Sequence, residues 1–163
     1  MIRESRQIAP LRTVRLTRPL VRMAQLASNS ILETSLELDS HADTTVLGGD
    51  ALIFQNYDRP VEVLGYDPSM GSKTYQTVSG ALAFDHPMTG QTYLLVFHQA
   101  ISMPQLDHHL LCPMQCRVND VIVNDVPKFL TLNPTDNTHA IVVQDPDDLV
   151  HHICFPLNIQ GVT

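Results

Sequence analysis

Residues 36–47 read Leu36-Glu-Leu-Asp-Ser-His-Ala-Asp-Thr-Thr-Val-Leu47. Leu36 and Leu38 alternate with a charged residue, which is the two-residue period of a strand with one buried face. The strand pattern stops at Asp39, and the short polar residues after it predict a turn. A carboxylate at the end of a buried strand stands on a rigid support, so Asp39 is a candidate for acid–base chemistry. Taken alone, the same residues are equally typical of an Asx turn with a purely structural role.

Short strands separated by turns are predicted along most of the chain after residue 30. Val61–Leu64 and the stretches 74–84 and 92–97 have strand patterns, and 118–126 has the rhythm of a hairpin. The helix that the sequence favours is short, over Leu110–Arg117, with Pro113 in its first turn. Long helices after residue 125 are disfavoured by four prolines, Pro127, Pro134, Pro146 and Pro156. We therefore predict an all-β fold, a small closed barrel or meander, with one short helix.

Length and composition fit a globular domain. The chain has 163 residues, of which 44% are hydrophobic and 17% charged. This is enough to bury a core without disulfides or structural metal ions. No apolar run approaches the ~20 residues of a membrane span, and nothing resembles a secretory leader. The three cysteines, Cys112, Cys116 and Cys154, cannot all pair, so we expect reduced thiols. The expectation is a cytoplasmic protein without a membrane partner.

The net charge of −7 is unevenly distributed. The first 22 residues hold six of the ten basic residues and one acid, so the remaining chain holds four basic and 16 acidic residues, a net −12. This acidic part is a poor nucleic-acid binder because it repels phosphates. Three interpretations of the basic arm, Arg3 to Arg22, stay open: a solvated tail, a weak contact with nucleic acid, or an organelle-targeting segment.

The run Asp39-Ser-His-Ala-Asp43, followed by Thr44-Thr-Val-Leu47, resembles the hydrophobic-Asp-Thr/Ser-Gly-Ala segment of retroviral and retrotransposon aspartic proteases. A second stretch, 98–115, resembles the passage that closes the protease of copia-type elements. The resemblance covers residues 33–130. It implies a retropepsin-like protease domain over 31–130, preceded by a flexible basic arm, 1–30. A C-terminal extension of strands or linker, 131–163, would follow.

The resemblance also implies a function. Retropepsins are aspartic endopeptidases that use two carboxylates sharing one proton, and this chain has one such motif, so Asp39 would be met by Asp39 of a second copy. Ser40 would hold the paired loops together, while His41, Ala42 and Asp43 would line the peptide site. A flap over Val61–Thr77 would bring Gly65 and Gly71 to the substrate. The expected partners are a peptide or polyprotein substrate and a second copy, in a cytoplasmic retroelement particle, with no cofactor or metal.

Two positions depart from the family pattern. His41 stands where the family has glycine, a residue that suits tight turns and close approach to the acid. The alternative is therefore a catalytically inactive module of the same fold that dimerises or binds peptides. Leu111-Cys112-Pro113 replaces the usual glycine before the helix, and Arg117 is the one arginine near it, so the partner of Asp43 is unassigned.

Histidines and cysteines offer a competing chemistry. The pairs in His109-x-x-Cys112-x-x-x-Cys116 and His151-His152-x-Cys154 are conceivable zinc ligands or nucleophile pairs. Their spacings match no standard closed zinc site, and a His-Glu-x-x-His helix is absent from the sequence. Structural histidines and inert thiols are the simpler interpretation, and a metal-binding hydrolase is the third hypothesis.

Overall fold

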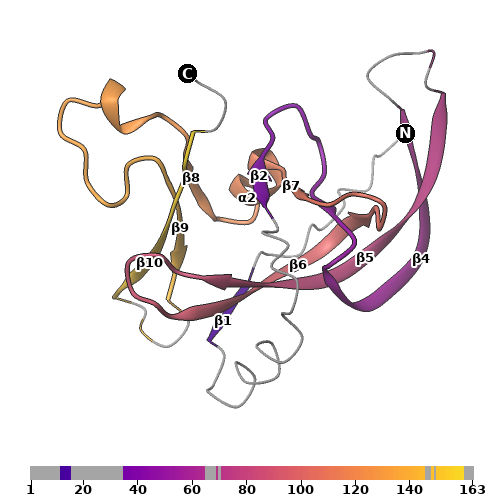
Figure 1. Cartoon of the computed structure of the whole chain (residues 1–163), viewed down its shortest axis with the longest axis horizontal. Coiled ribbons are helices and arrows are strands. Elements are labelled where there is room, and N and C mark those ends of the chain that lie inside the picture. Colours follow the sequence, from indigo (N-terminus) through magenta and orange to yellow (C-terminus); the bar gives the residue numbers. More distant parts are fainter. Residues whose placement is uncertain are drawn as a thin grey trace, which may run out of the picture.

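The computed structural model describes residues 12–15, 35–64, 69, 71–145, 148 and 150–159, and Figure 1 shows their arrangement. The strands in these ranges are β1 (Arg12–Arg15), β2 (Leu36–Leu38), β3 (Val46–Leu47), β4 (Leu52–Leu64), β5 (Ser72–Asp85), β6 (Thr92–Ser102), β7 (His109–Leu111), β8 (Ile122–Asn124), β9 (Ala140–Gln144) and β10 (His152–Pro156). The helices are α2 (Pro113–Arg117) and the 3₁₀ turn η2 (Lys128–Leu130).

The larger sheet has seven strands in the order β2-β7-β3-β6-β5-β4, with β1 paired to β6 outside this order. Strands β4, β5 and β6 form an antiparallel meander. Strand β7 instead enters between β2 and β3, and it runs parallel to β2. A late segment of the chain thereby joins the two strands that flank the 39–45 loop.

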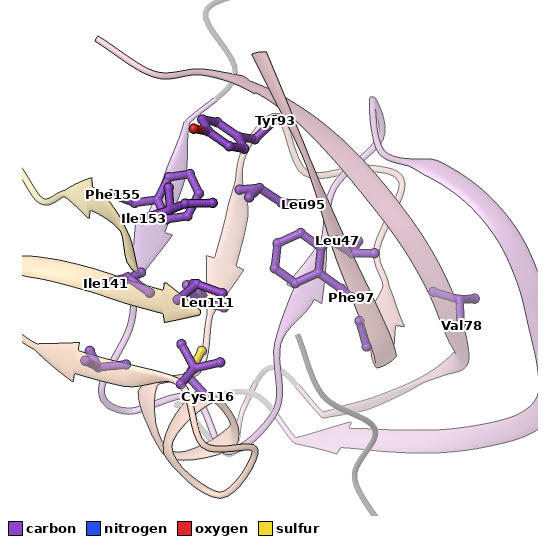
Figure 2. Close-up of a cluster of buried hydrophobic side chains, with 14 residues drawn as sticks. Leu47, Val78, Tyr93, Leu95, Phe97, Leu111, Cys116, Ile141, Ile153 and Phe155 are labelled. Atoms are coloured by element: carbon purple, nitrogen blue, oxygen red, sulfur yellow. The ribbon is translucent and has the colours of Figure 1, made fainter. Parts of the chain in front are cut away.

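The core lies where the two sheets meet. Along β6, buried and half-buried residues alternate, so Tyr93, Leu95 and Phe97 point to the core. Glycine is needed at Gly80 of β5, because a Cβ there would lie 2.6 Å from Cδ1 of Leu47. Figure 2 shows the cluster, which joins these β6 side chains to Leu47, Leu111, Ile141, Ile153 and Phe155.

The second sheet is small and antiparallel, in the order β10-β9-β8. Ile141 of β9 and Phe155 of β10 are buried in the same cluster as Tyr93 of β6, and the Tyr93 and Phe155 rings meet edge to face at 5.4 Å. Of the two alternatives for the segment after residue 131, the structure has strands, and these strands complete the core.

The all-β prediction is confirmed, and a short helix with Pro113 in its first turn is present. It covers Pro113–Arg117 only, because Leu110 and Leu111 of the predicted helix belong to strand β7. The closed barrel is wrong, since both sheets are open over the residues that the structure describes. Closure would require the two edge strands, β2 with 3 residues and β4 with 13, to pair with each other, and they do not. The hairpin over 118–126 is also wrong, because 118–120 form a turn, closed by the positive φ of Asp120, and β8 pairs with β9.

Four residues of the basic arm have a described structure. Arg12–Arg15 form β1, which pairs antiparallel with β6 from Val96 to Tyr93. The other residues of the predicted arm, including Arg3, Arg6, Arg18 and Arg22, lie outside the described residues. Within the described ranges, no helix has the length and apolar character needed to cross a membrane.

Candidate active site

Asp39 lies directly after the carboxyl end of β2, where the sheet opens into a loop (Figure 1). Its backbone N–H donates to the carbonyl oxygen of Leu111 (3.0 Å), which extends the parallel β2–β7 pairing by one residue. The backbone of this carboxylate is therefore held by the sheet, as catalytic groups require. The side chain is 33% exposed, so it can reach a solvent-borne substrate.

The Asp39 carboxylate caps its own turn. Oδ1 accepts the backbone N–H of His41 (2.9 Å), and the carbonyl oxygen of Asp39 accepts the N–H of Ala42 (3.3 Å). This is the Asx turn that the sequence permits. Among the described residues no side chain donates to the second oxygen, Oδ2, so one oxygen is left for a proton or a water.

His41 does not need the backbone freedom of glycine. His41 is not among the described residues that have a positive φ, so its backbone conformation is an ordinary one. Its imidazole is 95% exposed, with Nδ1 3.8 Å from Oδ1 of Asp39. In the single chain, a histidine side chain is sterically accommodated at this position.

The other predicted residues of this loop lie on its surface. Ser40 and Asp43 are exposed, and Ala42 is half-buried. The structure gives Asp43 no partner among the described residues, and Arg117 instead binds Oδ2 of Asp125 (3.0 Å) and the carbonyl oxygen of Val123. Asp39, Ser40, His41, Ala42 and Asp43 thus lie on one loop, and their predicted roles stay predictions.

The far end of the loop is fixed by residues that the sequence pattern did not single out. Thr45 is 3% exposed, and its N–H donates to Oε1 of Gln115 on α2 (2.9 Å). Its hydroxyl accepts the N–H of Cys112 (3.3 Å), and Cys112 Sγ in turn caps the N-terminus of α2. Two signals were available in the sequence: a polar residue six positions after the motif acid, and a glutamine in the first turn of the helix.

The predicted flap corresponds to the outer end of the β4–β5 hairpin. Val61 pairs with Tyr75 and Leu64 pairs with Ser72, whereas β6 pairs with β5 only from Gln76 onward. The outer end is therefore a two-stranded ribbon, which Figure 1 shows extending away from the rest of the sheet. Gly71 has a positive φ of 67° at the start of β5, and Gly65 lies outside the described residues.

The cysteines and histidines of the described ranges do not form the metal site that their spacing allows. Burial raises the pKa of the Cys116 thiol to about 12, which keeps it a thiol at neutral pH. His151 pairs with Asp148 on the surface (2.6 Å), apart from the buried Cys112 and Cys116. In the described ranges no three His, Cys, Asp or Glu side chains are grouped so that they could hold a metal ion.

A small pocket lies behind the loop, lined by Thr45, Phe97, His98, Leu111, Gln115, Cys116 and Asn119. Asp39 is not among its lining residues, so this pocket is not where the carboxylate acts.

No protein-family model matches this chain, and neither does any curated protein or solved structure. The site is therefore interpreted from its own geometry.

Proposed function

We propose that this chain is a retropepsin-like aspartic endopeptidase that acts as a homodimer and processes a retroelement polyprotein. The observation that carries the proposal is the placement of Asp39. It is a partly exposed carboxylate after a strand that is locked to β7, and β7 leads directly into the short helix α2. Along the chain, β2 is followed by Asp39, and later by β7, which pairs with β2, and by α2. This order fits the two sequence stretches that resemble the protease family.

The chemistry needs a second carboxylate. Two carboxylates about 3 Å apart share one proton because they cannot both ionise cheaply. The ionised member takes a proton from water, which attacks the peptide carbonyl, and the protonated member polarises that carbonyl. The sequence contains a single motif of this kind, so a two-fold symmetric pair of chains is required to supply both Asp39 residues.

The surface beside the loop suits contact with a second copy. Helix α2 fixes the loop through Gln115, and two apolar side chains, Met114 of this helix and its C-cap residue Val118, are each 60% exposed. Apolar side chains of this size are expected at the buried centre of a dimer interface. Ser40 and His41, at the exposed tip of the turn, would meet their counterparts across the two-fold axis.

The test compares peptide cleavage by wild type, Asp39→Asn and Asp120→Asn between about pH 4 and pH 7. Asp120 is an exposed turn residue whose positive φ asparagine tolerates, so it is a matched control for loss of one carboxylate. We expect Asp39→Asn to abolish cleavage while sedimentation still gives a dimer, and Asp120→Asn to cleave normally.

Cleavage by Asp39→Asn at the wild-type rate would refute the assignment. A dimeric wild-type protein that cleaves nothing and ignores a transition-state-like inhibitor would support the inactive binding module, with His41 as its distinguishing residue.

A further inference from the structure

A buried histidine joins the strands on both sides of the Asp39 loop. His109, the first residue of β7, is 1% exposed, and its backbone N–H donates to the carbonyl oxygen of Ser35 just before β2 (2.9 Å). Its side chain reaches in the opposite direction, where Nδ1 accepts the N–H of Gly48 just after β3 (2.8 Å). Strand β2 leads into the loop and β3 follows it, so His109 spans the base of the loop.

This hydrogen bond defines the charge state of the ring. A nitrogen that accepts an N–H carries no proton, so His109 is the neutral tautomer with its proton on Nε2. Nε2 lies 2.9 Å from Oδ1 of Asp50, which sets a carboxylate against the protonated side of the ring. The backbone at Gly48 is closely packed, because a Cβ on this residue would lie 2.4 Å from the carbonyl oxygen of His108.

We propose that neutral His109 is a positioning residue of the Asp39 site. Its protonation releases the N–H of Gly48 and thereby sets the lowest pH at which the site keeps its structure. Protonated His109 would present an N–H at Nδ1 to the N–H of Gly48, which places two donors face to face. The side-chain bond from β7 to Gly48 would be lost while the backbone pairing of Val46 with Leu110 remains, so the end of the loop at β3 would be held less firmly.

The titratable neighbours of His109 change its pKa in opposite directions. Burial lowers the pKa of His109 most strongly, the Asp50 carboxylate raises it, and the nearby His108 lowers it further. Asp107, also close in sequence, is paired with His108 at 2.8 Å. Replacing Asp50 and replacing His108 should therefore shift the pKa of His109 in opposite directions.

The experiment follows the amide resonances of Gly48 and His41 in the full chain as the pH is lowered from about 7.5 to 5, together with the cleavage rate. We expect both amides to shift with one midpoint below about 6.5. Asp50→Asn should move this midpoint down, and His108→Gln should move it up. His151→Asn, an exposed histidine elsewhere, should leave it unchanged.

His109→Asn supplies the final comparison, because the asparagine oxygen can accept from Gly48 without titrating. This variant should keep the Gly48 and His41 resonances constant over the same range. If it does not fold, the opposite shifts of the Asp50 and His108 variants carry the test. A Gly48 amide that stays constant in wild type, or shifts of equal sign in the two variants, would overturn the inference.

The catalytic part of this inference rests on the proposed function, and the two failures are distinguishable. Absent cleavage with an intact amide titration would remove the protease but leave His109 as the acid-sensitive support of the loop. If cleavage is normal but the lowest pH at which it occurs is unchanged in the Asp50 and His108 variants, the role of His109 would be refuted and the protease assignment would stand.

Discussion

At the scale of single residues, Asp39 combines a fixed backbone with an available carboxylate oxygen. The sheet holds its N–H, its own turn occupies Oδ1, and the side chain is one-third exposed. Its neighbour His41 differs from the family motif, yet it neither adopts a positive φ nor packs against other side chains. The sequence predicted the turn after the strand, because that signal is local and continuous, whereas the functional roles of its five residues stay predictions.

Replacement of His41 by glycine is therefore expected to be mild. His41→Gly should change the free energy of unfolding by less than about 1 kcal/mol. The side chain is solvent-exposed, so the one cost is the larger backbone entropy that glycine loses on folding. Chemical denaturation measures this change, with His152→Gly in β10 as an exposed comparison that sits in a strand. A loss of several kcal/mol would mean that His41 has a contact that its exposure does not suggest.

At the scale of elements, prediction succeeded where the signal is local and failed where distant segments pair. Alternating residues predicted the strands that became parts of β2, β4, β5 and β6, and Pro113 predicted the start of α2. The insertion of β7 between β2 and β3 depends on pairing over long sequence separations, which no periodicity encodes. The contact from Gln115 to Thr45 was missed for the same reason.

That contact gives the prediction at this scale. Gln115→Ala should destabilise the protein by about 1–3 kcal/mol, because the N–H of buried Thr45 would lose its acceptor. Gln115→Glu is the matched control, since a carboxylate oxygen can take the same hydrogen bond. Urea denaturation of the three proteins measures the effect. Equal stability of wild type and Gln115→Ala would show that α2 does not hold the loop.

At the scale of the whole molecule, stability is expected to depend on pH through His109. Its pKa is lowered in the folded chain, so between about pH 6.5 and that lower value the unfolded chain binds a proton that the folded chain does not. The free energy of unfolding should then fall as pH falls in this window, by at most ~1.4 kcal/mol per pH unit.

Denaturation at a series of pH values measures this slope. Asp107 and Asp148 also have pKa values lowered by hydrogen bonds, so their contributions are lost at more acidic pH, near and below the usual carboxyl range. A stability that stays constant from about pH 7 to pH 5 would contradict the description of His109 as a buried neutral group.

The central claim is that two copies of the chain each contribute one Asp39 to a single site. The most direct measurement mixes wild-type protein with an equal amount of Asp39→Asn, unfolds and refolds them together, and follows peptide cleavage. If the site needs both carboxylates, random pairing leaves about one quarter of the dimers active, so the rate should fall to about one quarter of that of wild type at the same total concentration. A rate of about one half, the value for chains that each act alone, would contradict the account.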